Sequence, residues 1–210
     1  PLLFFVLEIV DAILDLQDHC AMCGEKTTAG LRANVCNKDK CLYRFIELGV
    51  GMTLSKEIAR DPCVADLLFS VFSVTHNTIY FNPKPKKTKT PLETIINKMP
   101  SMESLSKKDD DSCLTQCIGQ ESSDILRWVI LTCRSNFLLL PRELEFPQFR
   151  SSTKEQCFQF MALTGSPEQE NIFQQLKKKY GSCFLWHGSP TERWHAIIRQ
   201  GLKNMTGTYY

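Results

Sequence analysis

Four cysteines limit what this chain can fold into more than any other feature of its sequence. They are Cys20, Cys23, Cys36 and Cys41, and they follow the pattern C-x2-C-x12-C-x4-C. Two pairs of thiolates joined by a polar connection can close on one tetrahedral zinc ion. The segment 19–41 is too polar to build a core of its own, so we expect a zinc knuckle there.

Spacing alone leaves a second interpretation open, in which the four thiols are free in a loop. If zinc binds, four thiolates leave no open position, which predicts a structural rather than a catalytic ion. The opening PLLFFVLEIVDAIL lacks a basic start and carries Glu8 and Asp11, so residues 2–18 are predicted to be a buried helix rather than a signal peptide. A disulfide framework is therefore not expected. The cysteines in apolar stretches are predicted to be reduced core residues, namely Cys63, Cys133, Cys157 and Cys183.

Charge and hydropathy narrow the function class. The 210 residues are 43% hydrophobic and 23% charged, as in ordinary soluble globular proteins. A net charge of +2 argues against nucleic acid as the main partner, and no apolar run reaches the roughly 18 residues of a membrane span. We expect an intracellular, cytoplasmic protein. The lysine-rich stretch 82–91 is predicted to be an exposed loop or hinge, with a basic targeting patch as the alternative.

Hydrophobic periodicity and capping residues predict a mainly helical N-terminal part. The expected helices are 55–60, a longer one from Asp61-Pro62 to about Val74, short ones in PLETIINKM and PSMESL, then 122–135 and 166–181. Buried strands are expected at FLLLP and at 182–187, and the charged run 107–112 is expected to be mobile. His76 is predicted to end a helix, and His19 and His195 to be exposed.

A turn between a strand and a helix is predicted at His187-Gly188-Ser189. Apolar residues lead into it, Gly188 breaks the strand, and Ser189 with Glu192 forms a capping-box pattern for the next helix. Backbone N–H groups are exposed at such a turn, and glycine lets a flat group approach the backbone. A histidine can donate to a hydroxyl. The turn therefore favours a planar amide and a sugar hydroxyl as ligand, with a purely structural role for His187 as the alternative.

The same stretch resembles a known family. FLWHGSPTERWHAIIRQGL resembles the start of the catalytic domain in poly(ADP-ribose) polymerase (PARP)-like ADP-ribosyltransferases. The upstream pieces resemble the six/eight branch, which transfers single ADP-ribose units. They are LYRFIELGVG, EIARDPCVADLL, INKMPSMESL, ILRWVILTCRS and SPEQENIFQQLKKKYGSCF. One departure is Phe-Leu-Trp before His187, where that branch usually has Phe-Ala-Phe.

The resemblance implies an α+β fold in two parts. Residues 1–150 would be a helical regulatory region with the cysteine-rich segment, and 151–210 the start of a PARP-type transferase domain. NAD would be the glycosyl donor. His187 would bond a ribose hydroxyl of NAD, Gly188 the nicotinamide carboxamide, and Ser189 would face the adenosine ribose. Protein side chains would accept the ADP-ribose through an oxocarbenium-like transition state.

The resemblance also implies that the sequence is a fragment ending early in the catalytic domain. The family has a tyrosine that stacks on nicotinamide, and Tyr209 and Tyr210 come too early to match it. The fragment alone is therefore expected to lack transferase activity. The alternative is a non-catalytic, zinc-stabilised protein-interaction module with a degenerate transferase remnant. Nucleic-acid binding through the knuckle and the lysine loop is a third, weaker possibility.

Overall fold

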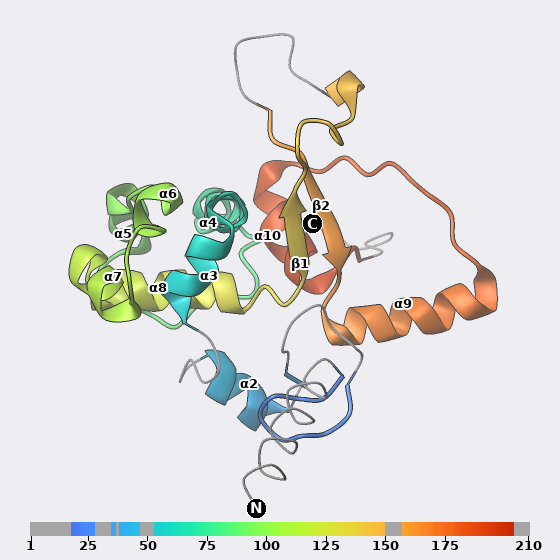
Figure 1. Cartoon of the computed structure of the whole chain (residues 1–210), viewed down its shortest axis with the longest axis horizontal. Helices are drawn as coiled ribbons and strands as arrows, with labels where there is room; N and C mark the ends of the chain where they lie inside the picture. The colour runs from blue at the N-terminus through green and yellow to red at the C-terminus, as the bar shows by residue number, and fades with distance from the viewer. Residues whose placement is uncertain (1–17, 28–34, 37, 47–52, 150–156, 204–210) are drawn as a thin grey trace, which may run out of the picture.

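The protein is described by a computed structural model over residues 18–27, 35–36, 38–46, 53–149 and 157–203. Most of the described elements are helices, and two strands form one antiparallel pair (Figure 1). The helices are α2 (Asp39–Ile46), α3 (Leu54–Arg60), α4 (Pro62–Thr75), α5 (Leu92–Lys98), α6 (Met102–Leu105), α7 (Asp111–Ile118), α8 (Gln120–Leu131), α9 (Pro167–Tyr180) and α10 (Thr191–Gln200). The strands are β1 (Asn136–Leu139) and β2 (Phe160–Thr164), and a short 3-10 turn covers Pro147–Phe149. The predicted α+β class is confirmed.

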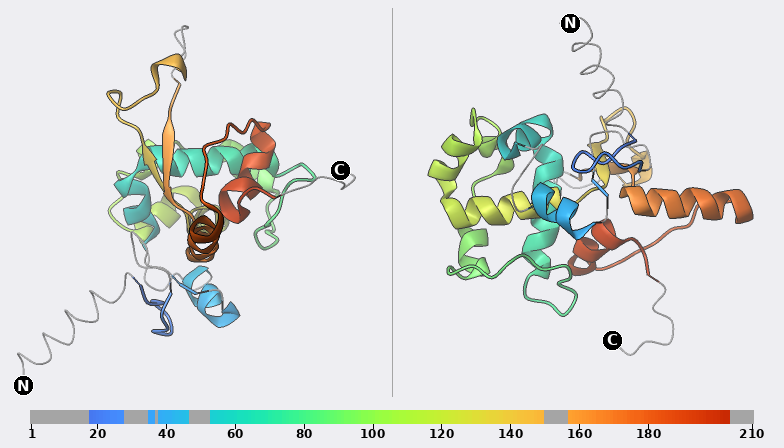
Figure 2. Two further views of the ribbon diagram at one scale, coloured as in Figure 1. Left: turned by 90° about the vertical axis from the view of Figure 1, so that its right-hand side faces the viewer. Right: turned by 90° about the horizontal axis from the view of Figure 1, so that it is seen from below.

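Helix α4 organises the packing. It contacts α3, α6, α8, β1 and, from the far end of the chain, α10 (Figure 2). One buried cluster includes Leu54, Leu114 and Leu126, and it extends to Cys20 and Cys41 of the cysteine segment. A second cluster centres on Phe72, Phe81 and Val129, and Ile198 of α10 packs against it. The cysteine segment and α10 therefore share the core of the helical region.

Local capping explains where the helices begin. Asp61 accepts a hydrogen bond from the Val64 amide at 3.0 Å, and Pro62 occupies the first helical position of α4, as predicted. Ser166 and Gln169 form the predicted reciprocal capping box at the start of α9. His76 ends α4, also as predicted. The side chains of Asp61, Ser166, Gln169 and His76 each satisfy a backbone group at a helix end, and Pro62 has no N–H to leave unpaired.

The lysine-rich loop is confirmed as an exposed connection. Residues 82–91 form neither helix nor strand, and Lys84, Lys86, Lys87 and Lys89 are all exposed. The Glu121 carboxylate holds the loop to α8 by accepting from the amides of Lys89 and Thr90 at 2.6 and 3.1 Å.

The charged run 107–112 was predicted to be mobile, but two of its residues, Asp110 and Asp111, are held by hydrogen bonds. Asp110 caps α7 by accepting from the Cys113 amide at 2.7 Å. The Asp111 carboxylate accepts from the amides of Leu54 and Ser55 at the start of α3, at 3.1 and 2.7 Å. It also forms an ion pair with Arg127 of α8 at 2.5 Å. Asp111 thus joins three helices, a role that only long-range packing reveals.

The substitution Asp111→Asn is expected to lower the free energy of unfolding at pH 7 by about 2 kcal/mol, since charge-assisted bonds are lost. Burial by itself would raise the pKa of Asp111, but the Ser55 and Leu54 amides and Arg127 together hold this pKa below its usual value. A depressed carboxyl pKa stabilises the fold above the unfolded pKa and ceases to do so as pH falls through the folded pKa. Urea denaturation should therefore show the difference from wild type shrinking below about pH 4.

The matched control is Asp109→Asn, because Asp109 is exposed. That variant should have the same free energy of unfolding as wild type at pH 7 and at pH 3. A difference between Asp111→Asn and wild type that stays constant down to pH 3 would contradict the assignment.

Residues 182–187 do not form the predicted buried strand. They run as an exposed connection between α9 and α10, and Phe184 and Trp186 are 106% and 87% exposed. A strand needs a neighbour to accept and donate its backbone hydrogen bonds, and no other strand of the described residues lies beside this segment. The predicted capping box at Ser189 and Glu192 is also wrong: Pro190 is the N-cap of α10, and no side chain caps it.

Several other predictions are decided by burial. Cys133 is a core residue, as predicted, whereas Cys63 is half-buried and both Cys157 and Cys183 are exposed. The FLLLP strand is confirmed as β1, although Leu138 is 41% exposed.

The predicted helix 2–18 lies almost entirely outside the described residues, as does the predicted domain boundary near 150. Among the helices that are described, none has both the length and the apolar character to cross a membrane.

Candidate functional site

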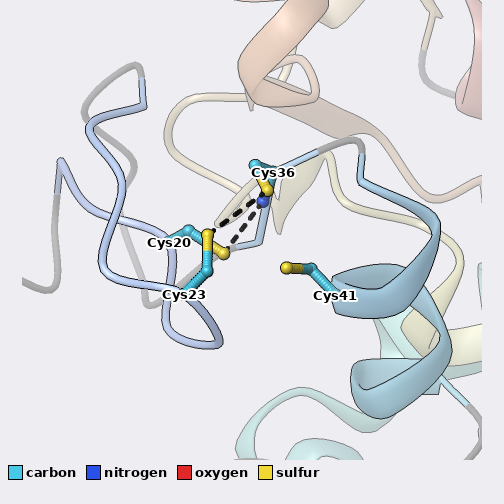
Figure 3. A group of neighbouring side chains, drawn as sticks. All are labelled: Cys20, Cys23, Cys36 and Cys41. Carbon is cyan, nitrogen blue, oxygen red and sulfur yellow. Dashed lines mark hydrogen bonds between the residues drawn. The ribbon is translucent and has the colours of Figure 1, made fainter.

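The four predicted metal ligands come together in the structure (Figure 3). Cys20 and Cys23 lie in a turn that Gly24 completes with a φ of 68°, and Cys41 lies in the first turn of α2. All four Sγ atoms are within 4.8 Å of one another, and those of Cys23 and Cys36 are 3.8 Å apart. Four sulfur donors at this separation can surround one thiophilic ion such as zinc. The cysteines are therefore positioned to bind a metal.

Backbone amides support this cluster from one side. The Cys20 Sγ accepts from the amides of Cys36 and Met22 at 3.3 and 3.4 Å. Burial alone would raise the pKa of Cys20, but these donors lower it to about 7. Burial and the neighbouring sulfurs raise the pKa of Cys41 to about 12. Four thiols so close cannot all ionise without a cation between them, which is the electrostatic condition that a bound metal satisfies.

Arg134 joins the segment beside Cys36 to the start of α9. Its Nη1 donates to the carbonyl of Val35, the fully buried residue beside Cys36, at 2.9 Å. The same guanidinium binds both carboxylate oxygens of Glu168, in the first turn of α9, at 3.1 and 2.7 Å. His19 lies beside the cluster, half-buried rather than exposed as predicted, and its Nδ1 pairs with Asp18 at 2.8 Å.

The predicted ligand-binding turn lies on the surface of the described chain. His187 and Gly188 are exposed, and Ser189 is half-buried ahead of α10. A Cβ at Gly188 would meet nothing within 4 Å, so a flat group has room to approach this backbone. Trp194 of α10 donates its indole N–H to the Ser189 carbonyl at 3.1 Å and presents its ring to His187 at 6.4 Å. Trp194 therefore fixes the turn to the helix that follows it.

His195 is buried rather than exposed, which corrects the prediction. It has no accessible surface and lies among the rings of Phe72, Phe81 and Trp128, stacked on Trp128 at 5.9 Å. Its Nε2–H donates to the Pro83 carbonyl at 3.0 Å, while Nδ1 has no partner among the described residues. Burial is the main cause that lowers its pKa to about 4. His195 thus anchors α10 in the core as a neutral side chain.

Arg199 completes this anchor, although no sequence motif pointed to it. Its guanidinium donates to the Val129 carbonyl at 2.7 Å and to the Thr132 hydroxyl at 3.1 Å, and it lies 5.8 Å from the Trp128 ring. No carboxylate of the described residues forms a salt bridge with it, and burial lowers its pKa. Its position one turn after His195 on the same helical face was the only signal that could have marked it.

Comparison with known proteins supports the family resemblance described for the sequence. The chain is similar to the proteins named "Protein mono-ADP-ribosyltransferase PARP8" of Mus musculus and of Homo sapiens. Each is 28% identical to it over 215 aligned positions, which cover 89% of this chain and 24% of the relative. The chain therefore spans about a quarter of the length of these curated relatives.

No protein-family model matches the chain, and no solved structure matches it. The similarity to the PARP8 proteins runs through most of the chain, well beyond the stretch around His187. It is thus a chain that resembles the PARP-like mono-ADP-ribosyltransferases, in their six/eight branch, along most of its length.

Proposed function

We propose that this chain carries part of the NAD-binding site of a protein mono-ADP-ribosyltransferase. The observation that carries the proposal is the open turn at His187-Gly188-Ser189, fixed to α10, in a chain similar to PARP8 over 89% of its length. The fold around the turn supports this role, because α10 is anchored to α4 and α8 by His195 and Arg199. A ligand-binding turn benefits from such a rigid support.

Each residue of the turn has a chemical role that its surroundings permit. The His187 ring forms no hydrogen bond with described residues and can donate to a ribose hydroxyl of NAD. Gly188 offers its N–H and C=O to the nicotinamide carboxamide, since no side chain stands in the way. Ser189 faces the adenosine ribose. NAD supplies the ADP-ribosyl group: its bond to nicotinamide breaks, and a side chain of a target protein attacks the ribose.

The test is NAD-dependent labelling by the full-length protein. His187→Ala is expected to lower kcat/KM for NAD about 100-fold, because an oriented hydrogen bond made in the transition state is lost. Lys178→Ala on the exposed side of α9 is the matched control and should label like wild type. A His187→Ala protein of unchanged melting temperature and full activity would refute the assignment.

We further propose that the ion at the cysteine cluster is structural zinc. Four thiolates leave no position for a substrate or water, so the ion acts by holding together a segment that is otherwise polar. Reduced thiols at a zinc centre also favour a reducing compartment, in line with the cytoplasmic location expected from the sequence.

The second candidate function is a non-catalytic, zinc-stabilised interaction module. The cysteine cluster favours it, because such a centre supports folding whether or not NAD binds. The labelling experiment separates the two: a zinc-loaded, folded, full-length wild-type protein that transfers no ADP-ribose from NAD would support the module.

A further inference from the structure

The four residues of the cysteine cluster differ sharply in exposure. Cys20 and Cys41 are 2% and 5% exposed, whereas Cys23 is exposed and Cys36 is half-buried. Cys23 and Cys36 are also direct neighbours, with their Sγ atoms 3.8 Å apart (Figure 3). An oxidant in solution therefore reaches Cys23 first and finds Cys36 beside it.

Hydrogen bonding reinforces this difference. The Cys20 Sγ accepts two backbone N–H groups, which reduce the reactivity of a thiolate by stabilising its charge. Within the described residues, Cys23 accepts no such bond from a backbone amide. Cys20 is thus shielded by burial and by its donors, whereas Cys23 has neither protection.

We propose that this centre is redox-labile: a peroxide converts Cys23 and Cys36 into a disulfide and releases the zinc. The inference rests on the proposed zinc site but not on the proposed transferase activity. A disulfide needs an S–S separation of about 2.05 Å, so the exposed Cys23 side chain must move towards Cys36 from the 3.8 Å that separates their Sγ atoms here. Zinc held by only two remaining thiolates has lost the closed tetrahedral set on which its affinity depends.

The reaction balances with hydrogen peroxide as oxidant. The Cys23 thiolate attacks one peroxide oxygen, the O–O bond breaks, and a sulfenic acid and hydroxide form. The Cys36 thiolate then attacks the Cys23 sulfur, an S–S bond forms, and a second hydroxide leaves. Two electrons pass from the two sulfurs to the peroxide, and two protons from solvent convert both hydroxides to water.

Loss of the ion would reach beyond the knuckle. Cys36 adjoins Val35, and Arg134 links the Val35 carbonyl to Glu168 at the start of α9. Releasing Cys36 from zinc therefore disturbs one end of this link. The expected disturbance therefore reaches the start of α9.

The experiment uses the zinc-loaded full-length protein treated with hydrogen peroxide. Zinc release is followed with a chromogenic chelator, and disulfides are mapped by mass spectrometry. We expect zinc release to follow the formation of a Cys23–Cys36 disulfide. We also expect a thiol reductant, with added zinc, to restore the zinc-bound protein. Cys23→His keeps four zinc ligands but lacks one disulfide partner, so release from this centre should slow at least tenfold.

Cys113→Ser is the matched control, because Cys113 is exposed and lies outside the cluster. It should release zinc at the wild-type rate. A Cys20–Cys41 disulfide, or equally fast release from Cys23→His, would overturn the proposal. A purified protein without zinc would refute the zinc site itself and with it the release, and neither result depends on whether NAD is turned over.

Discussion

Cys36→Ser is expected to abolish stoichiometric zinc binding and to unfold the knuckle around it. Removing one of four thiolates opens the tetrahedral site, and without the ion only packing against the core holds the turn at Cys20 and Cys23 to the start of α2. Losses of metal sites are among the few changes that cost more than about 4 kcal/mol. Metal content by mass spectrometry and hydrogen exchange over residues 18–46 would measure both effects.

The loss should extend into the core, because Cys20 and Cys41 belong to the buried cluster that includes Leu54 and Leu126. A strong chelator applied to the wild-type protein should reproduce the variant. Cys117→Ser is the control, since Cys117 is exposed on α7 and takes no part in the cluster. Full zinc content in Cys36→Ser, or unchanged amide protection in the knuckle, would show that these thiols hold no structural ion.

Acidification from pH 7 to pH 5 is expected to lower the free energy of unfolding by about 2 kcal/mol through His195 alone. Burial, and then the neighbouring Arg199, lower its pKa to about 4, while the bond to Pro83 opposes them. A depressed histidine pKa means that the folded state excludes a proton that the unfolded state binds. The stabilisation is therefore complete above about pH 6.5 and is lost as pH falls towards 4. Protonation would place an N–H on Nδ1, which has no acceptor among the described residues.

Urea denaturation of wild type and His195→Phe at several pH values tests this. The phenyl ring fits among Phe72, Phe81 and Trp128 but leaves the Pro83 carbonyl unpaired, so we expect a loss of about 1 kcal/mol at pH 7. The stability of this variant should depend much less on pH. His187→Gln, at an exposed histidine, should keep the wild-type pH dependence. A pH dependence unchanged in His195→Phe would assign the effect to another group.

Local chemistry made much of the fold predictable. The caps at Asp61 and Ser166 define the starts of α4 and α9 because a side-chain oxygen satisfies amides three residues away, which is a property of the adjacent sequence. The cysteine spacing likewise anticipated that four sulfurs converge. For the turn at His187, the sequence identified a position that the structure leaves open to solvent, although the strand expected before it did not form.

The sequence by itself therefore predicted most of the helices, the caps at Asp61 and Ser166, the convergence of the four cysteines and the family resemblance, but not α2 or α7. Tertiary structure alone decided which polar residues became buried. His195 and Arg199 lie in the core because α10 docks against α4 and α8, and Asp111 is ordered because α3 brings its amides to it. Residues 182–187 are exposed because a strand, unlike a helix, must obtain its hydrogen bonds from elsewhere in the chain. Pairings between distant segments are set by the fold, and no local pattern encodes them.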